Sequence, residues 1–418
     1  MDVPHSFIGA LEFTPTVRIM ELKSPCLNHD VLDYIAAHST RATVLTLMRT
    51  CKALHRDGAK YVLEDLESID IDLEKPEESV LSFLLFMAVE QGRRWHFVRA
   101  LRIVSEDAPS LPPNVAGQLA DALRHATRLK SLVLHQAEGF LRLHDDIAPA
   151  LASLKTIEVL EATYLWRRTF TLIKTASWPL RTVDIAFDHD DEDGELPEPE
   201  ELNPAALFCG ASSTLTEVAY RGWECYGEWL PSYPVFPNVR QLTVFGDHDA
   251  PTASWAQAYP NLTCLHTCTP VVCGGGRMSD DDHRVEMTDS VHAFNRRFNG
   301  RPGETFWSTL DEYYCCCLAD LYVLALPSRI RRIEMWQIDA WEMCFLSYTM
   351  SVARPEELYI NNVPLRDLPH YLKLSAKPGE SIFADLRLLD ITVTGEPEDV
   401  MSGLPGALVR PFFFPQCR

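Results

Sequence analysis

The chain has 418 residues, 46% of them hydrophobic and 23% charged, and a formal net charge of −21. This composition excludes wholesale disorder, and the acidic balance argues against a nucleic-acid backbone or an anionic membrane as the main partner, because both attract clustered Lys and Arg. The length exceeds that of one ordinary compact domain, which favours an elongated repeat array whose units pack only on their neighbours.

The beginning of the chain shows little hydrophobic periodicity, and we expect residues 1–24 to be loosely ordered. They lack a basic segment followed by a long apolar core, so a secretory signal is not expected. The most apolar stretch, Val80–Val89, is about half as long as a membrane-spanning helix requires. The twelve cysteines show no paired spacing, which favours reduced thiols in the cytosol, the nucleus or both.

Residues 25–68 are predicted to form short helices, because apolar residues recur there at helical spacing. A third helix is expected over Ala59–Leu66, and the alternating segment Ile69–Leu73 predicts a strand after it. The residues that carry the first two helical stripes are Leu27, Val31 and Ile35, and then Val44, Leu47, Met48 and Cys51.

One six-residue sequence pattern recurs through residues 69–418, with apolar residues at its first, fourth and sixth positions. We call it the apolar phrase. Its last two apolar positions lie two apart, as one face of a short strand requires. The copies are Val98–Ile103, Leu129–Leu134, Ile157–Leu160, Leu180–Ile185, Leu215–Tyr220, Val239–Val244, Leu262–Leu265, Ile330–Met335, Pro355–Ile360 and Leu386–Ile391. Helices are predicted over Glu77–Gln91, Asn114–His125, Ile147–Leu154 and Trp307–Leu326.

A strand and a return helix in each unit, stacked side by side, predict an α/β fold with a parallel sheet, arranged as an irregular leucine-rich-repeat-like solenoid. The alternative is an ordinary parallel α/β domain whose strands begin alike by chance. Two loop insertions are expected, at 188–201, which is acidic and rich in Pro, and at 268–289, which contains three consecutive Gly residues.

Residues 27–54 resemble the F-box, whose pattern begins Leu-Pro-x-Glu-[Val/Leu/Ile]-Leu-x-x-Ile, and they align with it without a gap. The chain reads Leu27-Asn-His-Asp-Val-Leu-Asp-Tyr-Ile35 at the start of the motif. At its end the chain reads Thr50-Cys-Lys-Ala-Leu54, where the family has Val-Cys-[Lys/Arg]-x-[Trp/Phe]. Asn28 replaces the Pro of the family, although Asn also serves as a helix N-cap. A later segment, Asp320-Leu-Tyr-Val-Leu-Ala-Leu-Pro327 followed by Ile330-Arg-Arg-Ile333-Glu, also resembles fungal F-box-like proteins that have leucine-rich tails.

The resemblance implies a three-helix hook that binds a Skp-family adaptor, and through it the cullin of an SCF-type ubiquitin ligase, while the tail holds a protein substrate of unknown identity. It implies no catalytic residue and no cofactor in this chain. One alternative is a non-catalytic leucine-rich scaffold with a degenerate F-box, outside any ligase; another is that the helices only build their own core. By the resemblance, the adaptor-binding residues are Leu27, Val31, Leu32, Ile35, Leu45, Leu47 and Lys52.

The best candidate for a metal site is a group of thiols and imidazoles: Cys264, His266, Cys268, Cys273 and His283. These are suitable zinc ligands, but their spacing is not the usual Cys-x-x-Cys. The alternation of the segment favours a strand instead, so no metal is expected. The chain also lacks the short motifs of nucleophilic, metalloprotease and dinucleotide-binding enzymes, which makes an enzyme on an α/β scaffold the least favoured hypothesis.

Overall fold

The computed structural model describes residues 28–50, 52–64, 68–105, 111–187, 204–221, 234–246, 252–268, 281–299, 306–364 and 385–394. The chain divides into two compact units, Met1–Asp65 and Leu66–Arg418. The expected loose segment 1–24 and the expected acidic loop 188–201 lie outside the described residues.

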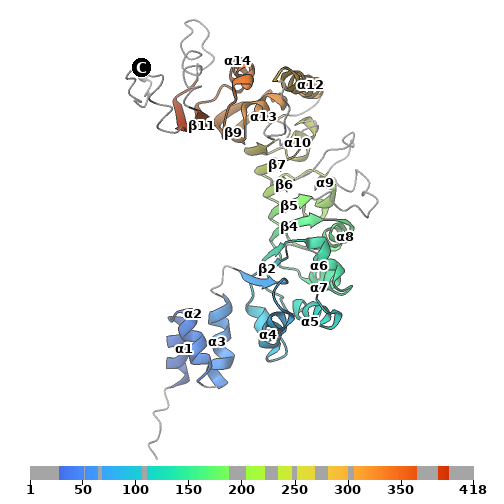
Figure 1. The fold of residues 1–418 in the computed structure, drawn as a ribbon, viewed down its shortest axis with the longest axis vertical. Coiled ribbons are helices and arrows are strands. Elements are labelled where there is room, and N and C mark those ends of the chain that lie inside the picture. The colour runs from blue at the N-terminus through green and yellow to red at the C-terminus, as the bar shows by residue number, and fades with distance from the viewer. Residues whose placement is uncertain are drawn as a thin grey trace, which may run out of the picture. The chain divides into compact units, whose positions relative to one another are not determined.

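The first unit contains three helices, α1 (His29–Ala37), α2 (Arg41–Met48) and α3 (Lys52–Glu64) (Figure 1). The first two begin at side-chain caps: the Asn28 side chain accepts a hydrogen bond from the Asp30 backbone N–H at 3.3 Å, and the Thr40 hydroxyl accepts one from that of Thr43 at 3.4 Å. The third helix begins at Lys52 rather than at Ala59 as predicted, because its first two turns are mostly polar and show no apolar stripe.

The core of the first unit lies mainly between α2 and α3. Val44 and Met48 of α2 are buried and face Gly58 of α3, where an added Cβ would lie 2.7 Å from Cγ of Met48. Glycine therefore permits the close approach of these two helices. The buried apolar residues of this unit are Ala36, Val44, Met48, Leu54, Ala59, Val62 and Leu63.

The second unit is an α/β fold with one sheet of twelve parallel strands, which pair in the order in which they occur in the chain. Eleven strands coincide with Ile69–Leu73 and the ten predicted copies of the phrase. The strands are β1 (Ile69–Asp72), β2 (Ala100–Val104), β3 (Ser131–Leu134), β4 (Val159–Leu165), β5 (Thr182–Phe187), β6 (Glu217–Arg221), β7 (Gln241–Phe245), β8 (Cys264–Cys268), β9 (Thr309–Cys315), β10 (Arg329–Met335), β11 (Glu357–Pro364) and β12 (Leu388–Thr394).

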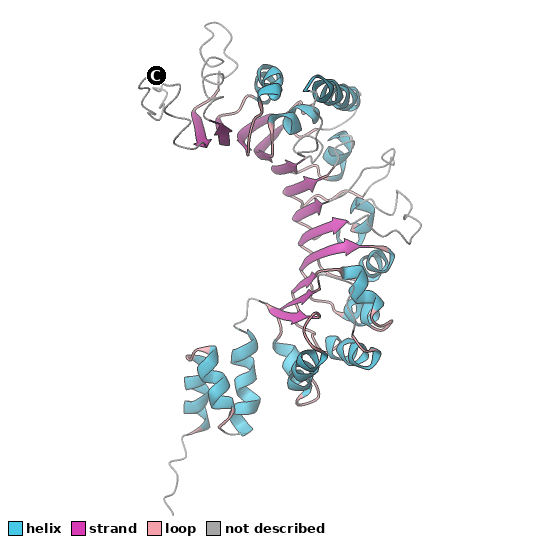
Figure 2. Ribbon diagram, viewed as in Figure 1, coloured by secondary structure: helices cyan, strands magenta, loops and turns pink. Residues whose placement is uncertain are grey.

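One face of the sheet is buried under helices, and side chains alternate between this face and the opposite one. Figure 2 shows the strands of this unit along one side and its helices along the other. The middle apolar residues of the phrases pair in register, so they form one continuous row inside the unit. This row is Ile69, Leu101, Leu132, Leu160, Val183, Val218, Leu242, Leu265, Tyr313, Ile333, Leu358 and Leu389.

The helices of the second unit include the predicted Glu77–Gln91, Asn114–His125 and Ile147–Leu154, whose ends differ from the prediction by at most three residues. Its helices, with 3₁₀ helices labelled η, are α4 (Glu77–Ala88), η1 (Arg93–Phe97), α5 (Pro113–Leu123), α6 (Ala137–Arg142), α7 (Ile147–Ser153), α8 (Arg167–Thr175), α9 (Pro204–Leu207), η2 (Cys209–Ala211), α10 (Thr252–Ala258), α12 (Asp281–Asn299), α13 (Leu318–Val323), η3 (Ala340–Glu342) and α14 (Met343–Ala353).

The predicted helix Trp307–Leu326 is wrong in its first half, which forms strand β9. Leu310, Tyr313 and Cys315 are the buried residues of this strand, and they repeat the spacing of the apolar phrase. The sequence pattern did not predict this strand because Tyr313 occupies the middle apolar position, where every other copy has an aliphatic residue, and Cys315 occupies the last position. Only its second half is helical, as α13.

The predicted loop insertion at 268–289 is also wrong in part, because Cys268 ends β8 and α12 begins at Asp281. Its helical face was not recognisable from hydrophobicity, since the residues that it buries, Thr288, His292 and Asn295, are polar. Asn295 Nδ2 donates to the Val323 carbonyl at 2.7 Å, and His292 Nδ1 lies 2.6 Å from the Tyr322 carbonyl. These side chains therefore provide hydrogen-bond partners for carbonyl groups at the end of α13, where the Tyr322 carbonyl also accepts from the Ala325 backbone N–H.

The expectation of reduced thiols is wrong for one pair, because Cys268 and Cys316 form a disulfide across a sequence separation of 48. Cys268 ends β8, and Cys316 directly follows β9, the neighbouring strand. Adjacent parallel strands bring the two residues together, which no spacing in the sequence could reveal. Cys315 and Cys317, on either side of Cys316, are buried thiols outside this disulfide.

Candidate functional site

Helix α1 exposes apolar side chains at helical spacing. Val31, Tyr34 and Ile35 are 44%, 68% and 39% exposed, and their positions i, i+3 and i+4 place them on one side of the helix. We call these three residues the α1 stripe. On α2, Leu45 is 38% exposed. Four large apolar side chains of two short helices thus remain in contact with solvent.

The other residues that the sequence assigned to adaptor binding differ in exposure. Leu32 and Leu47 are half-buried, and Lys52 is exposed at the start of α3. Leu27 lies outside the described residues. Tyr34 was not singled out from the sequence, although its position three residues after Val31 could have identified it; its ring packs edge-on against that of His38 at 4.5 Å.

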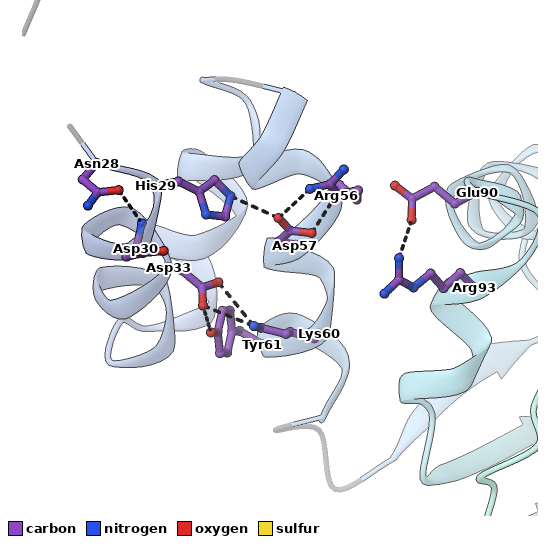
Figure 3. A network of polar contacts seen from close by, with 10 residues as sticks. All are labelled: Asn28, His29, Asp30, Asp33, Arg56, Asp57, Lys60, Tyr61, Glu90 and Arg93. Carbon is purple, nitrogen blue, oxygen red and sulfur yellow. Dashed lines mark hydrogen bonds and ion pairs between the residues drawn. The ribbon is translucent and has the colours of Figure 1, made fainter. Parts of the chain in front are cut away.

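Polar contacts hold the opposite side of α1 against α3 (Figure 3). The Tyr61 hydroxyl donates to Oδ2 of Asp33 at 2.8 Å, and Nζ of Lys60 lies 3.3 Å from the same oxygen. The hydrogen bond with Tyr61 raises the pKa of Lys60, and burial raises the pKa of Tyr61, so Lys60 remains charged and Tyr61 remains neutral near pH 7. The two helices are therefore joined by a charged hydrogen-bonded group rather than by large apolar residues.

A second polar group joins the start of α1 to α3. Nε2 of His29 lies 3.1 Å from Asp57, and Nε of Arg56 donates to Asp57 at 2.8 Å (Figure 3). The hydrogen bond with Arg56 lowers the pKa of Asp57 against the opposing effect of burial, and His29 lowers it further. Asp57 is consequently an anion over most of the pH range.

Helix α1 thus packs in an unusual orientation for an amphipathic helix. His29, Asp33 and the small Ala36 face α3, while the α1 stripe faces away from it. Large apolar residues normally face the core, and exposed apolar patches mark interaction sites. The geometry therefore makes the α1 stripe, together with Leu45, the candidate docking site of the first unit.

The metal candidate in the second unit is only partly assembled. Cys264 and His266 share one face of β8, with Sγ of Cys264 3.2 Å from Nε2 of His266. Cys268, on the same face, is engaged in the disulfide, and Cys273 lies outside the described residues. Burial raises the pKa of the Cys264 thiol to about 12, which disfavours the thiolate that zinc requires. In the part of the chain that is described, no three potential ligands gather.

Comparison with known proteins gave no relative: no family model matches the chain, and no curated protein is similar to it. The F-box resemblance therefore depends on the residues of this chain alone. Among the helices that the structure describes, none combines the length and the apolar character needed to cross a membrane.

Proposed function

We propose that this chain is a non-catalytic adaptor of an SCF-type cullin–RING ubiquitin ligase. In this proposal the first unit binds a Skp-family adaptor, and through it a cullin. The second unit, a leucine-rich-repeat-like solenoid, holds a protein substrate in the cytosol or nucleus. The bond-forming chemistry would come from the ligase rather than from this chain.

One observation carries the proposal: three of the six apolar residues that the resemblance assigns to adaptor contact are exposed on the first unit. Val31, Ile35 and Leu45 are each more than a third exposed, whereas Val44 and Met48 of the same motif form the core. If the motif served only to build a helical core, the large apolar residues of α1 would face α3. Instead, polar residues of α1 face α3.

The energy available from this surface is sufficient for specific binding. Full burial of a Val or Ile side chain contributes about 1.5–3 kcal/mol relative to leaving it exposed. Because Val31 and Ile35 are partly exposed in the free chain, a partner gains only part of this amount from each. Two such residues, with Tyr34 and Leu45, would supply the apolar centre that stable protein interfaces contain.

The test is co-purification of the full chain with a Skp-family adaptor, with and without Val31→Asp plus Ile35→Asp. We expect adaptor capture to fall at least about a hundredfold, because two carboxylates would be placed in a desolvated apolar contact. Neither residue belongs to the core, so the unit should stay folded, which circular dichroism and hydrogen exchange of α2 and α3 would verify.

Leu85→Asp is the matched control. Leu85 is a large apolar residue of α4 in the second unit and is 68% exposed, so the same change there should leave adaptor capture intact. Failure of the unmodified chain to bind any Skp-family adaptor would refute the ligase role. The chain would then be a leucine-rich scaffold with a degenerate F-box, which predicts partner binding by the second unit without proteasome-linked turnover of the partner.

A further inference from the structure

The face of the sheet opposite to the helices is strongly acidic. Alternation along the strands places nine carboxylates and three guanidinium groups of the described strand residues on this open face, all of them exposed or half-buried, and a fourth guanidinium group, that of Arg331, reaches Glu312 and Glu357. The acidic residues are Asp70, Asp72, Glu161, Asp184, Glu217, Glu312, Glu334, Glu357 and Asp390, and the basic residues are Arg102, Arg221 and Arg332. No described helix of this unit covers the face (Figure 2).

Aromatic and acidic side chains alternate on the open face over β9–β11. In the register of the sheet, Arg332 lies between Glu312 and Glu357, and Glu334 lies between Tyr314 and Tyr359. Trp336, which follows the buried Met335 at the end of β10, is 62% exposed. We define the aromatic–acidic patch by these residues: Glu312, Tyr314, Glu334, Trp336, Glu357 and Tyr359.

One guanidinium group already occupies this patch. Nη2 of Arg332 donates to Glu334 at 2.9 Å, and its guanidinium carbon lies 4.5 Å from the ring centre of Tyr359 and 5.8 Å from that of Tyr314. Nδ2 of Asn361 donates to the other oxygen of Glu334 at 2.9 Å and holds the carboxylate in place. The contacts of Arg332 therefore show how this patch accommodates a guanidinium group: the group lies near the aromatic rings and donates to an oriented carboxylate.

The two outer glutamates are held less tightly than Glu334. Glu312 accepts a hydrogen bond from the Tyr314 hydroxyl at 3.0 Å, and its nearest guanidinium nitrogen, from Arg331, is 4.0 Å away. Glu357 lies 3.5 Å from Arg331. Burial lowers the pKa of His266, so this neighbouring imidazole adds little positive charge near pH 7. Negative charge at the two outer positions is thus incompletely neutralised by the protein.

We propose that the aromatic–acidic patch docks an arginine-containing extended segment of a partner protein. The segment would place one guanidinium group against Glu312 or Glu357 and stack another on the exposed ring of Trp336. This inference deepens the proposed function, on which it rests for the idea that the second unit holds a substrate, and it names the chemistry of that substrate.

Arginine is favoured over lysine because its planar guanidinium stacks on aromatic rings and binds a carboxylate through two nitrogens, whereas an ammonium is a compact, strongly hydrated charge. An acidic segment or a nucleic acid would meet like charges on this face. The net acidity of the whole open face adds a long-range attraction that raises the association rate of a basic segment.

The test uses the full chain and three fluorescent peptides of equal length, in which glycine alternates with arginine, lysine or citrulline. Fluorescence anisotropy at low salt measures their dissociation constants. We expect the arginine peptide to bind about fivefold more tightly than the lysine peptide, and the neutral citrulline peptide not to bind detectably.

Two variants locate the contact. Glu312→Gln plus Glu357→Gln removes charge from the patch and should weaken binding of the arginine peptide about tenfold. Glu161→Gln plus Glu217→Gln removes the same charge from β4 and β6 on the same face. This pair should change the affinity for the arginine peptide by less than about threefold. Trp336→Ala, at an exposed position, should weaken binding of the arginine peptide about threefold.

Three results would each overturn the inference: no binding of the arginine peptide, equal losses for the two glutamate pairs, or equal affinity for the arginine and lysine peptides without any effect of Trp336→Ala. Self-association of the chain that is abolished by the Glu312 and Glu357 substitutions would assign the patch to a second copy instead. Capture of a Skp-family adaptor is measured on the same preparations and tests the proposed function, whereas peptide binding tests the aromatic–acidic patch. Loss of one signal without the other therefore shows which of the two proposals is wrong.

Discussion

The two units of the chain differ in what they leave exposed. The first unit exposes Val31, Tyr34, Ile35 and Leu45 on two short helices and joins α1 to α3 through polar contacts. In the second unit the middle apolar residues of the phrases form a continuous row, which is buried from Ile69 to Leu358 and half-buried at Leu389, and the opposite face of the sheet is mainly acidic. The first surface has the chemistry of a permanent apolar contact, and the second has that of a charged, reversible one.

This contrast shows that regularly spaced apolar residues are exposed in one unit of the chain and buried in the other. A stacked array has neighbours on both sides that bury each apolar phrase. A unit of three short helices has too little interior to bury every large apolar residue. Exposure in the first unit is therefore consistent with the proposed adaptor contact, whereas burial in the second unit follows from the fold alone.

The largest expected effect comes from replacing one buried residue of the second unit and comparing it with one exposed residue of the first. Leu132→Ala, at a fully buried position, should destabilise the second unit by about 2–5 kcal/mol. Ile35→Ala should cost less than about 1 kcal/mol, because this side chain is 39% exposed. Denaturant unfolding with hydrogen exchange resolved by peptide measures both; equal costs would contradict the contrast between the units.

Loss of the disulfide should affect the second unit alone. Cys268→Ala plus Cys316→Ala removes a cross-link between residues 48 apart and should destabilise that unit by about 2–4 kcal/mol, since the unfolded chain gains freedom. Peptide mapping without reductant should recover the linked pair, and thermal unfolding measures the loss. Cys209→Ala, at an exposed free cysteine, is the control and should change nothing; the absence of a linked peptide would show that the pair is reduced in solution.

The polar face of α12 provides a smaller test within the second unit. Asn295 is fully buried, and its side chain satisfies the Val323 carbonyl, so Asn295→Ala should destabilise the unit by about 1–3 kcal/mol. Arg297→Ala, at an exposed position on the same helix, should stay within about 0.5 kcal/mol of the unmodified chain. Equal effects in thermal unfolding would mean that α12 is not anchored by its polar side chains.

The smallest expected effect is a pH dependence in the first unit. The pKa of Asp57 is lowered in the folded state by Arg56 and His29, so its contribution to stability is present above the ordinary aspartate pKa and is lost as the pH falls through the lowered value. Asp57→Asn should remove about 0.2–1 kcal/mol at pH 7 and nothing at pH 2. Unfolding of the first unit, followed by hydrogen exchange at both pH values, measures this; a loss that persists at pH 2 would point to packing instead of charge.

Most strands of the second unit could be predicted because each is marked by apolar residues that lie within a few positions of one another in the chain. A phrase such as Leu129–Leu134 places two apolar residues on one side of a strand whatever its neighbours are, so eleven strands were found. Strand β9 and helix α12 were missed where other residue types replace the aliphatic pattern. Tyr313 fills the buried row of β9, and the buried face of α12 is polar because it contacts carbonyl groups at the end of α13.

The sequence alone determined the parallel order of the sheet in outline and the helical stripes of α1 and α2, because periodicity is a property of neighbouring residues. Only the tertiary structure decided which side of α1 faces α3, since a helix with polar partners on α3 can turn its apolar side outward. It alone also brought Cys268 to Cys316 and placed Arg332 among Tyr314, Glu334 and Tyr359. Except for Arg332 and Glu334, which are neighbours on β10, these contacts join residues that are far apart in the chain and on or beside different strands, and strand pairing sets their distances.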